Sequence, residues 1–202
     1  MKSRFLFTVV CSFAFATLFS LVGLVQAQET ETKQETAEQE EVEALELAGG
    51  DFKLQFPTVW NKVEAKSSMI EVEVKVPMAD GDDSERDGRL TIMAAGGSID
   101  ANIERWKGQF SQPDGSATSE KTKVEEIEVD GMKAHMVDIS GTYGERARMT
   151  APPTMREDYR MLAAIIETGA QQYFIKFYGG STTVEANEER FKNFIKSFAK
   201  SD

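Results

Sequence analysis

Alternation of apolar and polar residues with a period of two is the pattern that most restricts how this chain can fold. Phe52, Leu54 and Phe56 alternate with polar residues before a proline. Residues 69–78 repeat the pattern, with aliphatic residues at the even positions from 70 to 76 and charged residues at 71, 73 and 75. Because successive side chains of a strand point to opposite faces, each segment predicts a strand with one buried face. We expect the charged face of the second strand to be exposed to solvent.

Further strands are expected where apolar segments lie between turn residues. Residues 90–94 give a third strand, and residues 121–129 and 132–143 flank Asp130-Gly131. This dipeptide tolerates the positive backbone angles of a two-residue turn, so it predicts an antiparallel hairpin. Residues 159–167 and 172–178 are expected to form two more strands, joined at residues 168–170. The sequence therefore predicts an antiparallel sheet of about six to seven strands.

Two segments have helical spacing. In residues 99–109, the apolar positions recur every three or four residues, Ser98 is a suitable N-cap, and Asp100 lies where the helix dipole favours an acid. A second helix is expected over residues 184–199, with Thr182 and Glu185 as a capping box. Its predicted buried stripe is Val184, Phe191, Phe194, Ile195 and Phe198.

Both predicted helices follow the same tripeptide, Gly-Gly-Ser, at residues 96–98 and 179–181. The helix sequences at 99–107 and 184–192 are also similar. They are either a duplicated element or two independent solutions to one capping problem, and we favour the second interpretation because the preceding strands differ. The glycine pairs could also form an anion site at a helix end. Capping by Ser98 and Thr182 is the interpretation we favour.

Strands joined mainly by hairpins, with two helices, indicate an α+β domain in which each helix covers one face of the sheet, an α/β/α sandwich. Residues 52–60, which read FKLQFPTVW, the last strand, and residues 190–198, which read RFKNFIKSF, resemble the PsbP-like family. The resemblance covers the two ends of the domain and the order of its elements. It implies a compact, non-catalytic module that binds or supports another component.

The N-terminus predicts export. Lys2 and Arg4 precede an apolar run over residues 5–25, which ends in Val-Gln-Ala at residue 27. This pattern is typical of a secretory signal peptide over residues 1–27, and the alternative is an uncleaved membrane anchor. We expect cleavage, a periplasmic or extracellular location, and no membrane span afterwards. Cleavage would remove Cys11, the only cysteine, so the remaining 175 residues could form no internal disulfide.

The next segment, residues 28–50, holds eight Glu and one Lys, a net charge of −7. Because residues 28–41 lack large aliphatic side chains, we expect a disordered acidic linker, with a short helical turn through Val42, Leu45 and Leu47. An acidic interaction arm is the alternative. A single domain is expected over residues 51–202.

The sequence offers little for catalysis. It has one histidine, no cysteine beyond the leader and no Gly-x-Ser-x-Gly motif, so we expect no catalytic residue, no metal site and no cofactor. His135 could be a general base, but a histidine packed or hydrogen-bonded in the sheet is favoured. The alternative function is an exported hydrolase with a carboxylate-based site. We expect no nucleic-acid partner, because the whole chain has a net charge of −11.

Two loops contain candidate binding residues. Arg146, Arg148 and Arg156 cluster in the segment 141–158, and arginines can bind carboxylates or phosphates in a bidentate manner. One hypothesis is that this loop contacts an unknown protein or an anionic envelope component or glycan, but a mobile surface loop balanced by Glu145 and Glu157 is favoured. Five acids in residues 80–87 could hold calcium. Their spacing does not fit an EF-hand, so a solvated hairpin loop is favoured. A monomeric binding module is the function that these observations favour.

Overall fold

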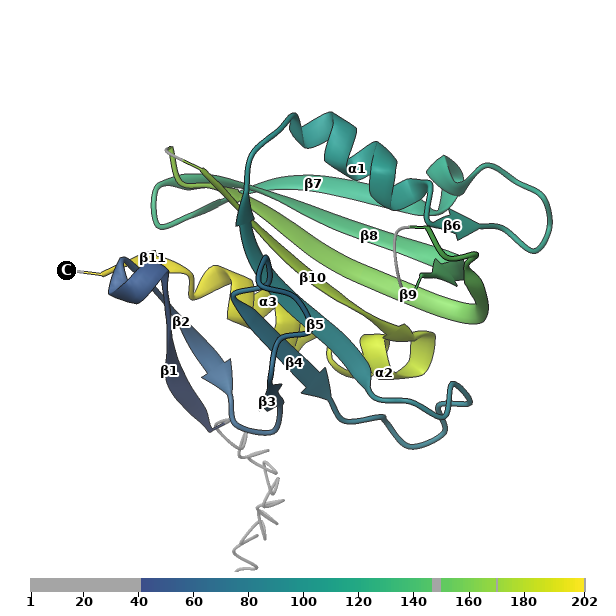
Figure 1. The fold of residues 1–202 in the computed structure, drawn as a ribbon, viewed down its shortest axis with the longest axis horizontal. Helices are drawn as coiled ribbons and strands as arrows, with labels where there is room; N and C mark the ends of the chain where they lie inside the picture. The colour runs from purple at the N-terminus through teal and green to yellow at the C-terminus, as the bar shows by residue number, and fades with distance from the viewer. Residues whose placement is uncertain (1–40, 147–149, 170, 202) are drawn as a thin grey trace, which may run out of the picture. The chain divides into compact units, whose positions relative to one another are not determined.

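An eight-stranded antiparallel sheet forms the centre of the computed structural model, which describes residues 41–146, 150–169 and 171–201 (Figure 1). Its strand order is β3-β4-β5-β10-β9-β8-β6, and β7 also pairs with β8. The bounds are β3 Asn61–Val63, β4 Val72–Val76, β5 Gly88–Ala95, β6 Phe110–Ser111, β7 Thr122–Val129, β8 Met132–Glu145, β9 Thr154–Glu167 and β10 Gln172–Gly180.

A smaller sheet joins the two ends of the domain, in the order β1-β2-β11. Its strands are β1 (Val42–Leu47), β2 (Phe52–Pro57) and β11 (Ala199–Lys200). A short 3-10 turn over Ala48–Gly50 connects the first two, and another lies at Thr118–Lys121. The prediction of six to seven strands in one sheet was therefore too low, because the additional strands β1, β3, β6 and β11 are short or lie in polar sequence.

The position of β1 corrects the predicted extent of the acidic linker. The linker was expected to extend to residue 50 with a helical turn, but residues 42–47 form a strand that pairs with β2 in full register, from Val42 opposite Pro57 to Leu47 opposite Phe52. Leu45 and Leu47 alternate with acids and point into the core, with exposed fractions of 7% and 0%. Burying these two leucines favours the strand over a solvated segment. Residues 1–40, including the predicted leader, lie outside the described residues.

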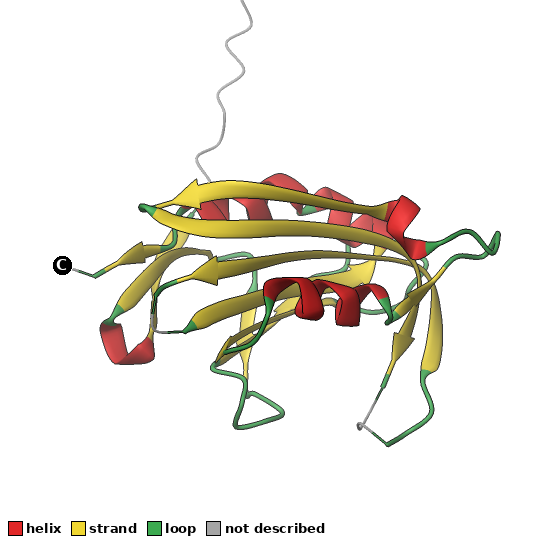
Figure 2. Cartoon of the chain, turned by 90° about the horizontal axis from the view of Figure 1, so that it is seen from above, coloured by secondary structure: helices red, strands yellow, loops and turns green. Residues whose placement is uncertain are grey.

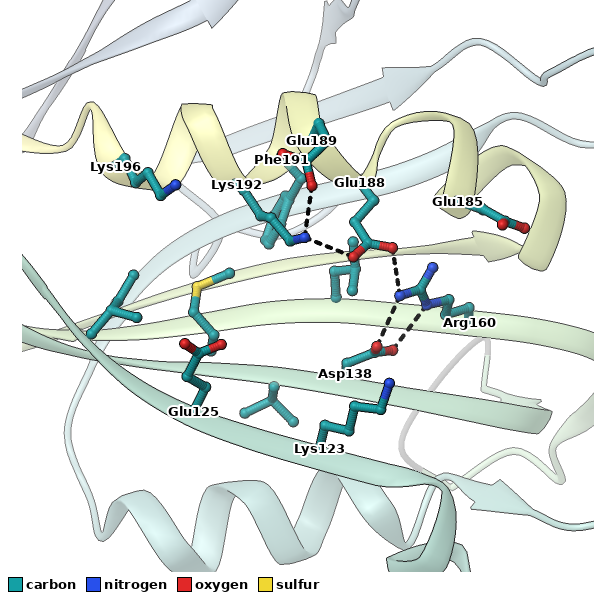
Figure 3. Close-up of a pocket in the computed structure, with 14 residues that line it drawn as sticks. Lys123, Glu125, Asp138, Arg160, Glu185, Glu188, Glu189, Phe191, Lys192 and Lys196 are labelled. Carbon is teal, nitrogen blue, oxygen red and sulfur yellow. Dashed lines mark hydrogen bonds and ion pairs between the residues drawn. The ribbon is translucent and has the colours of Figure 1, made fainter.

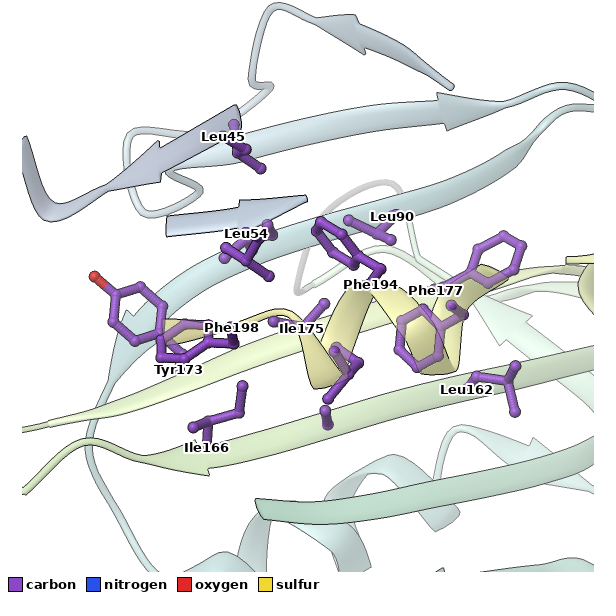
Figure 4. Close-up of a cluster of buried hydrophobic side chains, with 14 of the residues drawn as sticks. Leu45, Leu54, Leu90, Leu162, Ile166, Tyr173, Ile175, Phe177, Phe194 and Phe198 are labelled. Carbon is purple, nitrogen blue, oxygen red and sulfur yellow. The ribbon is translucent and has the colours of Figure 1, made fainter. Parts of the chain in front are cut away.

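The helices lie on opposite faces of the large sheet, as predicted (Figure 2). Alternate residues of β9 define the two faces: Met161, Ala163 and Ile165 pack with Ile103 and Trp106 of α1 (Ile99–Lys107). The residues between them, such as Leu162 and Ile166, pack on the other face with α2 (Ser181–Ala186), α3 (Glu188–Lys196) and the small sheet. Figure 4 shows this second cluster around Phe177, Phe194 and Phe198.

The 130–131 hairpin forms as predicted. Val129 pairs with Met132, and Asp130 and Gly131 have φ angles of 48° and 72°. Two consecutive positive φ angles are the geometry of a type I′ turn, whose twist suits the flanking strands.

Ser98 also caps α1 as expected, because its hydroxyl accepts a hydrogen bond from the Ala101 N–H at 3.4 Å.

The C-terminal helix differs from its prediction in two ways. It begins at Ser181 instead of residue 184, so Thr182 lies inside the first turn and the Thr182 and Glu185 capping box does not form. No side chain of the preceding residue caps the helix. It is also divided at Asn187, whose Oδ1 accepts a hydrogen bond from the Trp60 indole N–H at 3.0 Å in the core.

None of the helices in the described part of the chain is long and apolar enough to cross a bilayer.

Candidate functional site

A cavity of about 710 Å³ lies on the α1 face of the large sheet. Arg89 on β5 and Tyr178 on β10, which pair across the sheet, form its floor, and Tyr159 on β9 continues it. The loop between β4 and β5 contributes a wall that includes Met78 and Arg86, and the end of β8 contributes Glu145. We call this site the tyrosine–arginine cavity.

The floor is held by an ion pair whose carboxylate is buried. The Arg89 Nε donates to Glu73 Oε1 at 2.8 Å, and its Nη1 donates to the Tyr178 hydroxyl at 2.7 Å. Glu73 is only 2% exposed, so the prediction that this side of β4 would be wet was wrong at Glu73. The hydrogen bond from Arg89 is the largest cause of a lowered pKa of Glu73, and it outweighs the opposing effect of burial. The carboxylate therefore stays ionised.

Three tyrosine rings lie together beside this pair. The rings of Tyr143 and Tyr159 are stacked, with centroids 6.0 Å apart and an interplanar angle of 6°, and the Tyr178 ring is 5.0 Å from that of Tyr143. Lys176 Nζ lies 5.5 Å and 5.0 Å from the centroids of Tyr143 and Tyr178 and donates to Gln109 Oε1 at 2.7 Å. Burial, with repulsion from two nearby arginines, lowers the pKa of Lys176 to about 7.

A second ion-pair cluster lies at the edge of the cavity. Glu145 Oε2 accepts from Arg86 Nη1 at 3.2 Å, and from Nε and Nη2 of Arg156, both at 3.1 Å. Arg86 belongs to the β4–β5 loop, whereas Arg156 and Glu145 belong to β9 and β8. The cluster therefore connects three segments.

The structure brings together only part of the predicted arginine cluster. It is shorter than expected, because β8 continues to Glu145 and β9 begins at Thr154. Arg156 lies within β9 and joins the cluster with Arg86, while Arg146 donates to the Ala151 carbonyl at 2.7 Å. Arg148 lies outside the described residues. Arg156 is thus the member of the predicted set that the structure places near the cavity.

A second groove, of about 640 Å³, lies on the opposite face between β7–β9 and the C-terminal helices (Figure 3). Arg160 donates twice to Asp138, at 2.9 and 2.8 Å, and pairs with Glu188 at 2.7 Å. Glu188 also pairs with Lys192 at 2.8 Å. The Lys192 hydrogen bond is the main cause of a lowered pKa of Glu188. These charges neutralise one another. Because Arg160 belongs to β9 and Glu188 to α3, the network fastens α3 to the sheet.

The other candidates from the sequence have structural roles. His135 Nε2 is 3.0 Å from Glu167 Oε1, so the histidine is hydrogen-bonded within the sheet, as favoured. In the acidic loop, Asp82 is 8% exposed and accepts from the Thr183 N–H at 2.8 Å and from the Thr183 hydroxyl. Among the residues that the structure describes, no group of three or more His, Cys, Asp or Glu side chains could hold a metal ion.

Sequence reasoning missed Arg89 and Tyr178, the centre of the cavity. A signal was present in the charged odd positions of β4, which face the Arg89 side of the neighbouring strand. Lys75 is directly opposite Arg89, and Glu73 is opposite Thr91. Opposite charges on adjacent strands interact directly or diagonally. The register between two strands was the information needed to infer this pair, and the spacing along one strand does not give it.

An antiparallel sheet between helices, with this order of elements, is the PsbP-like fold. Among solved structures, the cyanobacterial PsbP protein CyanoP from Synechocystis sp. PCC 6803 is similar, with a TM-score of 0.50 and 11% identity over 82% of this chain and 96% of CyanoP. A mutant of the protein Mog1 has a TM-score of 0.51 and 11% identity over 80% of this chain and 97% of Mog1. No family model and no curated protein matches the sequence. The likeness shows the fold alone.

Proposed function

We propose that this chain is an exported, non-catalytic module that binds a protein partner at the tyrosine–arginine cavity. The observation that carries the proposal is that Arg86 and Met78, exposed by 51% and 43%, lie beside a floor made by Arg89 and by the buried Tyr159 and Tyr178. Arginine, tyrosine and methionine are enriched in protein–protein interfaces, and arginine and tyrosine supply a large part of their binding energy. The leader-like N-terminus supports export.

The charges of both concave surfaces support binding over catalysis. A glycosidase-type hydrolase requires one carboxyl group that stays protonated near neutral pH, which means a raised pKa. Here arginine or lysine partners lower the pKa of Glu73 in the cavity and of Glu188 in the groove. Both groups are therefore ionised and paired. The hydrolase alternative lacks the acid that its mechanism needs at these two positions.

The binding proposal can be tested by capturing partners from the native envelope and culture medium with the purified protein. The variant R86E/R156E reverses two charges at the cavity, and K62E/K121E reverses the charges of two exposed lysines elsewhere. We expect the first variant to lose at least tenfold of a specific captured protein and the second to retain it. Equal capture by both variants, with both folded by circular dichroism, would refute the cavity as the binding site.

Export is tested separately by cell fractionation and intact-mass measurement. We expect the protein outside the cytoplasm, with a mass that corresponds to a chain beginning at Gln28. A cytoplasmic protein that retains Met1 would contradict the proposal, whatever the capture experiment shows.

A further inference from the structure

Four cationic side chains at the tyrosine–arginine cavity share two carboxylates. Lys66 and Arg89 both pair with Glu73, and Arg86 and Arg156 both pair with Glu145. Each guanidinium has five N–H donors. The contacts to Glu145 use one nitrogen of Arg86 and two of Arg156, and all of them end on a single oxygen, Oε2. The two arginines therefore have donor capacity beyond what Glu145 satisfies.

The two carboxylates differ in how firmly they are held. Glu73 is buried and also accepts a hydrogen bond from the Lys66 backbone N–H at 2.9 Å, so it is part of the floor. The Glu145 side chain is 36% exposed and lies at the last residue of β8, and Arg86 is 51% exposed. Exposed ion pairs such as Glu145–Arg86 contribute little to stability, about 0–1 kcal/mol. Arg156, the other partner of Glu145, is 26% exposed. A competing carboxylate could therefore displace Glu145 without unfolding any element.

The arrangement also fits one kind of ligand group. Arginine binds carboxylates through two parallel N–H bonds, and here two arginines from separate segments converge on one carboxylate position. Met78, which is 43% exposed, lines the same cavity and offers apolar contact to the rest of a peptide. Glu64, Glu85 and Asp87 also line the cavity and repel anions, so the contact that we infer is confined to the position where Arg86 and Arg156 converge. At 0.15 M salt the Debye length is about 8 Å, which screens the more distant charges of the chain.

We infer that the tyrosine–arginine cavity recognises an acidic segment of its protein partner, whose carboxylate replaces Glu145 between Arg86 and Arg156. This inference rests on the proposed function and adds to it the chemistry of the partner. Glu145 is then an internal competitor that occupies the position in the free protein.

The test uses two peptide probes, acetyl-Glu-Glu-Tyr-Glu-Glu-amide and the matched peptide with glutamine at each glutamate, titrated at 0.15 M salt. Calorimetry gives the affinity, and the Nε–H resonances of Arg86 and Arg156 in NMR spectra report the site. Because E145Q removes the internal competitor, we expect it to bind the acidic peptide about fivefold to tenfold more tightly than the unaltered protein. R86Q/R156Q should lose binding, and the glutamine peptide should not bind.

The matched control is E43Q, which removes a carboxylate from the exposed Glu43–Lys62 pair and should leave the affinity unchanged. Unchanged or weaker binding by folded E145Q would overturn the inference, because a purely structural Glu145 predicts that result. Equal binding of inorganic phosphate would also overturn it, since the site would then be a general anion site. If partner capture still depends on Arg86 and Arg156 in either case, the proposed binding function stands and only its carboxylate chemistry fails.

Discussion

Asp82 and Thr183 are 101 residues apart in the sequence, yet the Asp82 carboxylate accepts hydrogen bonds from both the backbone N–H and the hydroxyl of Thr183. Thr183 lies in the first turn of α2, whose preceding residue provides no side-chain cap. Asp82, from the β4–β5 loop, therefore takes the place of an N-cap side chain. It also fixes that loop, which forms a wall of the tyrosine–arginine cavity.

Asp82→Ala should lower the free energy of unfolding by about 1–2 kcal/mol, the range for loss of a helix cap. The Thr183 N–H would lose its partner at a buried position. Urea denaturation measures the change, and Asp83→Ala is the matched control, because Asp83 is exposed in the same loop. A loss as large for Asp83→Ala as for Asp82→Ala would show that the cap is not the cause.

Gly180→Ala should be destabilising by about 1–3 kcal/mol through overpacking. A Cβ atom at residue 180 would overlap the carboxylate oxygens of Asp82. The same substitution in the Asp82→Ala background should cost much less, because the overlapping atoms are gone, so the two effects should not be additive. A double-mutant cycle measured by thermal unfolding checks this expectation, and additive effects would contradict it.

Glu73→Gln should lower the free energy of unfolding by about 2 kcal/mol at pH 7, because glutamine has no charge for Arg89 and only one oxygen to accept from both Arg89 and the Lys66 N–H. The folded-state pKa of Glu73 lies below its unfolded value, so its stabilisation is fully present above the unfolded pKa, about 4.3. It is lost as the pH falls through the folded-state pKa. Urea unfolding at several pH values should show the two proteins converging in acid. A constant difference across the range would exclude the ionised pair as its source.

Lys176 should make the protein more stable as the pH rises above neutrality. Its folded-state pKa is about 7, whereas an unfolded lysine titrates near 10.4. Between these values the unfolded chain binds more protons, so the free energy of unfolding increases with pH. In Lys176→Met this increase should disappear, and in the exposed control Lys75→Met it should remain. Urea unfolding between pH 6 and 9.5 checks the slopes, which should be equal if Lys176 is charged in the folded state.

Much of the fold follows from local patterns in the sequence. The Asp130-Gly131 turn, the Ser98 cap and the placement of one helical layer on each face were predictable, because each depends on residues close in sequence or on the period of a single element. β1 was missed because Leu45 and Leu47 lie within an acidic segment, and their burial depends on β2 as a partner. The break at Asn187 depends on Trp60, 127 residues away.

The site was less predictable than the fold. The sequence indicated Arg156 through its clustering with Arg146 and Arg148 in the segment 141–158, which also contains its partner Glu145. Arg86, which shares Glu145, comes from the distant β4–β5 loop. The Arg89, Glu73 and Tyr178 group requires the register of β4, β5 and β10. Charged side chains can be counted along a sequence, whereas the pairing that sets their pKa and exposure is a property of the assembled sheet.

The small sheet joins residues from both ends of the domain: β11 pairs with β2 beside β1, and the Ser201 N–H donates to the Asp51 carbonyl at 3.0 Å (Figure 1). β2 therefore has a hydrogen-bonded neighbour on each side, β1 on one and β11 on the other. Without β11, the edge of β2 at Phe52 and Lys53 would be open, and an open strand edge can pair with a strand of another chain.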